Sequence, residues 1–169
     1  MNGDELKALQ APLKQRYRED PGAALITLRA SGTLDASGVS CRVDTGKALV
    51  EAGLHPATGG TGMLACSGDM LLEALAACAG VTLRAVATAL GIEIRSGKVS
   101  TEGDLDFRGT LGVSKEAPVG FQAIRVAFVL DTSAGADQLA SLQKLTERYC
   151  VVAQSLRVTP SFSVEIVNS

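Results

Sequence analysis

Two cysteines in unlike settings are the residues of this chain best suited to do chemistry. Cys78 lies inside the nearly all-apolar stretch LLEALAACAGV of residues 71–81, whereas Cys150 directly follows the Glu-Arg-Tyr segment of residues 147–149. The two thiols are 72 positions apart (150 − 78), and each lies on a predicted helix. Such a pair suggests redox chemistry, in which one thiol reacts first and the other resolves the oxidised product.

The alternative for each cysteine is an inert place in the core, because apolar surroundings make a thiol a poor nucleophile. The neighbours of Cys78 at helical spacing, Ala74 and Leu75 among them, fit this alternative. Cys66 lies in a glycine-rich loop and is either a spare thiol or a third redox partner. Cys41 lies in a strand pattern, where we expect a core residue.

Length and charge bound the class of protein. The chain has 169 residues and a net charge of −2. This length fits one domain whose core needs no disulfide or metal, and the charge gives no indication of a nucleic-acid or membrane partner. The first seven residues are polar and acidic, unlike a secretory signal. We therefore expect a cytoplasmic protein, in which structural disulfides are rare.

Metal and nucleotide sites lack their usual signatures. The four cysteines have no Cys-x-x-Cys spacing and are accompanied by a single histidine, His55, so a tetrahedral zinc site is not expected. The glycines of residues 59–62 lack the Lys-Ser/Thr ending of a phosphate-binding loop. We expect neither a metal nor a cofactor, and we expect His55 to be a loop residue, with a substrate contact as the alternative.

The order of predicted elements is typical of an α+β domain. An amphipathic helix is predicted over residues 3–19, within an N-terminal extension of residues 1–22 that precedes a domain of residues 23–169. Strands are predicted over residues 24–30, 39–43, 99–107, 123–132 and 161–167, with residues 47–52 as a further candidate. Helices are predicted over residues 69–90 and 136–148. Ser67 and Asp69 are candidate caps of the first of these helices, and Gly91 is expected to end it.

The predicted helix of residues 69–90 is apolar on almost every side and must therefore be buried on almost every side. A membrane span is the competing interpretation. Glu73 and Arg84 lie inside the helix, however, and the apolar run of residues 74–81 is far shorter than the roughly 20 residues that a bilayer needs. One small domain cannot easily cover such a helix, so we expect a second subunit to contribute a matching helix in an obligate homodimer.

The two cysteine motifs together resemble those of the OsmC/Ohr family of thiol-dependent peroxidases. Residues 69–78 (DMLLEALAAC) are similar to the central-helix signature of that family, and residues 147–152 (ERYCVV) are similar to its second-cysteine motif. The spacing and element order agree with the family over residues 24–167.

The resemblance implies an intertwined homodimer in which antiparallel sheets wrap long central helices. It also implies that Cys78 attacks an organic or hydrogen peroxide, that Cys150 resolves the sulfenic acid as a disulfide, and that an external dithiol reduces it. The family couples its thiolate to an acidic residue, for which Asp69 is the match, and to an arginine. Arg29, Arg42 or His55 are the candidates for that last role here.

Two other functions remain open from the sequence. The first is a protein of the same fold without catalysis, which binds a small hydrophobic ligand in the crevice of the dimer. The second is a redox sensor that uses the same two thiols at low turnover.

Overall fold

The main sheet has five strands in the order β2-β1-β5-β6-β7. The structure, a computed structural model, describes residues 3–34, 41–43 and 52–167. The strands are β1 (Leu25–Leu34), β2 (Cys41–Val43), β5 (Ser96–Asp106), β6 (Phe121–Asp131) and β7 (Ser161–Ile166). All neighbours pair antiparallel except β6 and β7, which are parallel. This last pairing requires a crossover, and two helices, α4 (Ala136–Tyr149) and α5 (Val151–Ser155), provide it.

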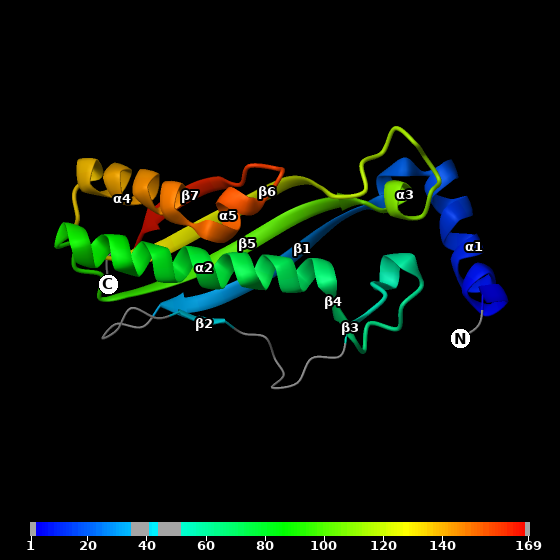
Figure 1. Cartoon of the computed structure of the whole chain (residues 1–169), viewed down its shortest axis with the longest axis horizontal. Coiled ribbons are helices and arrows are strands. Elements are labelled where there is room, and N and C mark those ends of the chain that lie inside the picture. Colours follow the sequence, from blue (N-terminus) through cyan, green and yellow to red (C-terminus); the bar gives the residue numbers. More distant parts are fainter. Residues whose placement is uncertain (1–2, 35–40, 44–51, 168–169) are drawn as a thin grey trace.

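The long helix α2 (Ser67–Leu90) lies across one face of this sheet, with α4 and α5 next to it (Figure 1). Leu72, Leu75 and Leu83 on α2 are fully buried, and they share one core cluster with Val99 on β5 and Phe128 on β6. The Thr101 hydroxyl of β5 donates a buried hydrogen bond of 2.9 Å to the carbonyl of Leu72. The α+β fold predicted from the sequence is confirmed.

A second, smaller core lies at the end of the molecule where α1 (Gly3–Glu19) and α3 (Phe107–Thr110) meet (Figure 1). Its buried members are Tyr17, Ala24, Ala57, Phe107 and Leu111. They come from α1, from α3 and the residue after it, and from two short 3-10 turns, η1 (Pro21–Ala24) and η2 (Pro56–Thr58). The N-terminal helix is therefore packed onto the body of the protein through side chains of its own.

The boundaries of α2 differ from the prediction at one end. The helix begins at Ser67, and Cys66 is the N-cap residue without a side-chain capping bond. The expectation that Ser67 and Asp69 cap the helix is wrong, because both residues lie inside its first turn. Gly91 ends the helix with φ of 67°, a left-handed conformation that favours glycine, as predicted.

The other helices and strands agree with the sequence in type and place, although β1, β5 and β6 begin or end a few residues away from the predicted bounds. The predicted turn of residues 35–38 and most of the candidate strand of residues 47–52 lie outside the described residues. The glycine-rich loop contains two short parallel strands that were not expected, β3 (Ala52–Gly53) and β4 (Ala65–Cys66).

Helix α2 is not covered on every side within a single chain. By length and composition it could cross a membrane, with a mean hydropathy of 1.6 over 18 residues, but one side of it packs on the sheet and on α4 as a core helix does. Met70, Leu71 and Val81 on its other side are 38%, 37% and 39% exposed. An apolar stripe of this helix therefore remains open to contact.

Candidate active site

Cys78 and Cys150 come from different elements that pack together. Cys78 lies in the middle of α2, half-buried and packed against the main core. Cys150 is fully buried and joins two helices, as the last cap of α4 and the first cap of α5. The prediction that Cys150 lies on a helix is wrong, because the chain leaves helical geometry at Cys150 and a new helix starts at Val151.

The side chains of these two cysteines interact directly. Burial raises the pKa of Cys150 to about 11, and a hydrogen bond with Cys78 contributes to the rise. The amides of Ala153 and Val152 oppose the rise in part, although neither makes a regular capping hydrogen bond with the sulfur. Cys150 is therefore a protonated thiol at neutral pH, held against the side chain of Cys78.

Thr146 lies one turn before Cys150 and has an unusual hydroxyl. The Thr146 carbonyl accepts a hydrogen bond of 3.0 Å from the Cys150 amide. Its hydroxyl oxygen is buried and makes no hydrogen bond with any described residue. Burial of a hydroxyl without a hydrogen-bond partner destabilises the folded state. Thr146 is therefore an unfavourable position next to Cys150.

Asp69, the third predicted site residue, is not brought to Cys78 within one chain. The two residues are nine positions apart on α2, which corresponds to a rise of about 13 Å and half a turn around the helix. Burial raises the pKa of the half-buried Asp69 carboxyl, and the nearby His55 lowers it. Asp69 thus interacts electrostatically with His55.

His55 is fixed by two contacts. Its ring stacks on Phe107, with ring centres 5.0 Å apart and planes 12° apart. Its Nδ1 accepts a hydrogen bond of 3.0 Å from the Ala57 amide, which caps the η2 turn. Burial lowers the pKa of His55, and Asp69 raises it. A single histidine in a glycine-rich loop was the only sequence signal for this site, and it could not indicate these partners.

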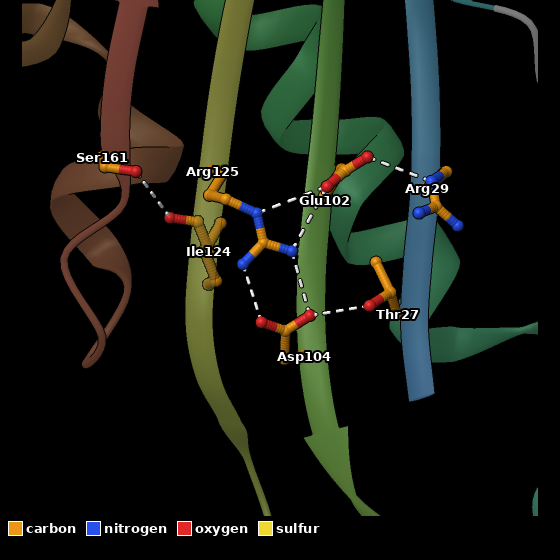
Figure 2. A network of polar contacts seen from close by, with 7 residues as sticks. All are labelled: Thr27, Arg29, Glu102, Asp104, Ile124, Arg125 and Ser161. Carbon is orange, nitrogen blue, oxygen red and sulfur yellow. Dashed lines mark hydrogen bonds and ion pairs between the residues drawn. The ribbon is translucent and has the colours of Figure 1, made fainter. Parts of the chain in front are cut away.

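The other two candidates for an activating cation, Arg29 and Arg42, lie on strands β1 and β2. Arg29 lies on the outer face of the sheet, the face opposite α2, where its Nε donates a hydrogen bond of 3.0 Å to Glu102 (Figure 2). Its side chain is 69% exposed, so it does not serve Cys78 of its own chain. Arg42 lies on β2, but its side chain is outside the described part of the structure.

A charged network occupies that same outer face. Arg125 of β6 makes hydrogen bonds of 2.7 and 2.9 Å with Asp104 and of 3.3 Å with Glu102, and Thr27 donates to Asp104 at 2.9 Å (Figure 2). The Arg125 guanidinium holds the pKa of Asp104 below its usual value. These residues satisfy one another across three strands, and no free acid or base of this network faces α2.

The remaining cysteines, Cys66 and Cys41, lie on other elements. Cys66 is half-buried at the start of α2 and packs against the main core. Cys41 lies on β2, as its strand pattern predicts, but its side chain is outside the described residues. Among residues that the structure describes, no group of three or more His, Cys, Asp or Glu side chains could hold a metal ion.

An open, mostly apolar groove of about 510 Å³ lies two helical turns from Cys78 along α2. Its lining includes Leu71, Pro118, Val119, Phe121, Ile124 and Arg157. Arg157 is the charged residue of this lining. The groove could hold an apolar chain, with an anionic group at Arg157.

Comparison with known proteins places the chain in a family. No curated protein matches it in sequence. Its fold is similar to that of an OsmC-like protein from Mycoplasma pneumoniae, with 14% identity, a TM-score of 0.55, and coverage of 85% of this chain and 94% of the other. It is also similar to a Legionella pneumophila protein described as organic hydroperoxide resistance protein OsmC and predicted redox protein, with 16% identity, a TM-score of 0.55, and coverage of 83% and 96%. The family model for OsmC-like protein matches residues 60–165, more than half of the sequence, and the chain belongs to the OsmC-like family.

Proposed function

We propose that this protein is a thiol-dependent peroxidase that reduces organic or hydrogen peroxides with Cys78 and Cys150. The observation that carries the proposal is the direct interaction of the two thiols, which come from α2 and from the α4–α5 junction. Membership of the OsmC-like family adds support, and so does the description of the Legionella pneumophila protein as a hydroperoxide resistance protein.

The proposed reaction has three steps. The Cys78 thiolate attacks one oxygen of the peroxide, the O–O bond breaks, and the leaving oxygen takes up a proton, so that an alcohol or water departs and Cys78 becomes a sulfenic acid. The Cys150 sulfur then attacks the Cys78 sulfur; hydroxide leaves, and with the Cys150 proton it forms water. An external dithiol, which a cytoplasmic location would provide, reduces the disulfide by thiol–disulfide exchange.

The high pKa of Cys150, about 11, suits the second role better than the first. A thiolate is the nucleophile in both steps, and a thiol that remains protonated at neutral pH does not compete for peroxide. Cys150 already interacts with Cys78, so proximity offsets its low thiolate fraction.

We also propose that the protein works as a homodimer. The support is an apolar surface around the open side of α2 that a second copy would cover. Its exposed members on the helix itself are Met70, Leu71 and Val81. Light scattering at micromolar concentration should give twice the mass of the chain, and a stable monomer would contradict the dimer.

The decisive experiment on the reaction is the intact mass before and after one equivalent of an alkyl hydroperoxide. We expect the loss of two hydrogens, reversed by a dithiol, with consumption of the peroxide. Unchanged mass and unchanged peroxide would reject the peroxidase. Oxidation that occurs once but does not turn over with excess dithiol would instead indicate a redox sensor.

The groove of about 510 Å³ favours one alternative, a non-catalytic protein that binds a small hydrophobic ligand. Under this alternative, the fluorescence of an apolar probe should rise on binding to the protein, and substitution of Val119 by Glu should abolish the rise. The thiols should then be unnecessary, so that Cys78→Ser leaves probe binding unchanged and peroxide is not consumed by the parent protein.

A further inference from the structure

We propose that the buried hydroxyl of Thr146 acts in the second step of the proposed reaction, where it donates a hydrogen bond to the Cys150 sulfur as that sulfur becomes a thiolate. This inference rests on the proposed peroxidase function. It concerns the thiol that resolves the sulfenic acid, not the thiol that meets the peroxide. It assigns a task to a buried hydroxyl that has no hydrogen-bond partner among the described residues.

Thr146 and Cys150 lie on one buried stripe of α4. Leu142, Thr146 and Cys150 follow one another at intervals of four residues, and each is 0% exposed. Side chains four residues apart are neighbours on a helix, with Cβ atoms about 5–6 Å apart, and the later side chain leans back toward the earlier one. The hydroxyl and the thiol are therefore neighbours in the part of the core that α4 forms with α2 (Figure 1).

The helical spacing of these two residues is retained at the end of α4. The Cys150 amide donates its hydrogen bond of 3.0 Å to the Thr146 carbonyl. Cys150 also has a helical φ of −70°, and the chain leaves the helix only through its ψ of 101°. Because φ sets the direction of the Cα–Cβ bond relative to the preceding turn, the Cys150 side chain starts out as it would inside a helix.

The Thr146 hydroxyl does not use the backbone acceptor that hydroxyls on helices commonly use. Thr88 on α2 and Ser155 on α5 each donate a hydrogen bond of 2.8 Å to the carbonyl four residues before. The corresponding acceptor for Thr146 is the Leu142 carbonyl, and the hydroxyl bonds neither to it nor to any other described residue. A threonine hydroxyl on a helix has two favoured rotamers, so this donor is free to turn to a new acceptor.

The resting state of Cys150 explains why it does not engage this donor. The hydrogen bond with Cys78 contributes to the raised pKa of Cys150. A bond that raises the pKa of a thiol favours its protonated form, so the Cys150 S–H group is the donor and Cys78 the acceptor. The sulfur of a protonated thiol is itself only a weak acceptor. The Thr146 hydroxyl therefore makes no strong bond with Cys150 while the thiol retains its proton.

Oxidation of Cys78 changes this arrangement. The Cys150 proton can then pass to the oxygen of the sulfenic acid, and the electron pair left on the Cys150 sulfur attacks the Cys78 sulfur. The S–S bond forms, the S–O bond breaks, and water leaves with the proton of Cys150. The sum is one thiol and one sulfenic acid converted to one disulfide and one water. Thr146 keeps its own proton throughout.

A hydroxyl donor has its largest effect while the negative charge is on Cys150. Burial is the main cause of the high pKa of Cys150, about 11, so the thiolate forms in surroundings that disfavour it. A hydrogen bond to an ionised acceptor is about twice as strong as one between neutral groups. A bond that is absent in the resting thiol and present as the thiolate attacks lowers the barrier of this step. The unpartnered hydroxyl of the reduced protein is thus placed in advance for the charged state.

The test follows the two steps of oxidation separately. The reduced protein is mixed with one equivalent of an alkyl hydroperoxide and quenched with acid at successive times. Intact mass then reports the gain of one oxygen in the sulfenic acid and the loss of two hydrogens in the disulfide. Thr146→Val retains the shape of the side chain without its hydroxyl. We expect oxygen to be gained at the parent rate and the disulfide to form about 10- to 10²-fold more slowly, so that excess peroxide over-oxidises Cys78.

Two further variants separate the hydroxyl from packing and from general effects near the thiol. Thr146→Ser retains the hydroxyl and removes the methyl group, and it should form the disulfide at close to the parent rate even if it is less stable. Ser155→Ala is the matched control, because it removes a hydroxyl that already donates to the Val151 carbonyl at 2.8 Å. It should change neither step.

Three results would overturn the inference. The first is disulfide formation at the parent rate in Thr146→Val. The second is an equal slowing of both steps in that variant, and the third is an equal slowing of disulfide formation in Thr146→Val and Thr146→Ser, because each would show that packing matters and the hydroxyl does not. A parent protein that gains no oxygen and consumes no peroxide would reject the proposed function, and this inference with it.

Discussion

The Cys150 thiol is hydrogen-bonded to Cys78, although the two residues belong to separate helical elements of the fold. One of the partners is fully buried and the other is half-buried. Cys78 is the more accessible of the two, so under the proposed function it would meet the peroxide first and Cys150 would resolve the product.

Substitutions of the two cysteines should therefore differ. Cys78→Ser should abolish peroxide consumption, because the peroxide loses the sulfur that it meets first. Cys150→Ser should still allow one stoichiometric oxidation and should then stop as a sulfenic acid that is open to over-oxidation. Mass spectrometry with a sulfenic-acid trap distinguishes these outcomes. Equal, full turnover in both variants would exclude a two-thiol mechanism.

The raised pKa of Cys150 predicts a loss of stability at alkaline pH. The folded state prefers the protonated thiol, so its contribution is fully present below the ordinary value of 9.0 and is lost as pH rises through about 11. The free energy of unfolding should fall over this window by about 2–3 kcal/mol more than that of Cys150→Ser. Urea titrations of both proteins at pH 8 and pH 11, under anaerobic reducing conditions, measure the difference. Parallel pH curves would contradict the shift.

The buried hydroxyl of Thr146 predicts that its removal will stabilise the protein. Thr146→Val replaces a buried hydroxyl that has no partner among the described residues with a methyl group of similar shape, so the free energy of unfolding should rise by about 1–2 kcal/mol. Thermal unfolding of the reduced protein measures it. A stability loss of similar size would show that the hydroxyl has a partner in solution.

Gly103 tests the packing of α2 on the sheet. A Cβ at this buried position would lie 2.5 Å from the Phe121 ring and 3.3 Å from Leu72, so Gly103→Ala should destabilise the fold by about 1–3 kcal/mol. Gly120 is the matched control, because a Cβ there meets nothing within 4 Å. Urea unfolding of both variants should separate them, and an equal, small effect would mean that the ring moves aside freely.

Asp69→Asn should weaken peroxide reduction less than either cysteine change, because Asp69 lies half a turn and about 13 Å of rise away from Cys78 on α2. Steady-state kcat/KM with an alkyl hydroperoxide is the measure. Complete loss of activity, with the fold intact by circular dichroism, would mean that Asp69 is as essential as the thiols.

The sequence predicted most of the fold, since its signals were local ones. The almost wholly apolar segment of α2, the strand patterns of β5 and β6, and Gly91 each reflect a single element and its nearest neighbours. The start of α2 was misplaced because capping residues were expected where Cys66 enters the helix without a side-chain bond.

The candidate site was less predictable because its contacts join distant segments. The two thiols could be chosen from their settings, but their mutual contact depends on how α4 crosses α2. His55 could not be connected with Asp69 and Phe107, since these two neighbours come from other elements and carry no shared spacing with it. The hydrogen bond from Tyr17 to Ala57 spans 40 positions, beyond the reach of any periodic pattern.

The position of Cys150 on the crossover between β6 and β7 has a consequence for the oxidised protein. A bond to Cys78 would close a covalent ring over 72 positions, and this ring would contain β5, β6 and α4. By chain entropy such a ring is worth about 4 kcal/mol against unfolding. The stability against unfolding would then increase when the disulfide forms and decrease when it is reduced, once in every turnover. The disulfide form would be the more stable of the two.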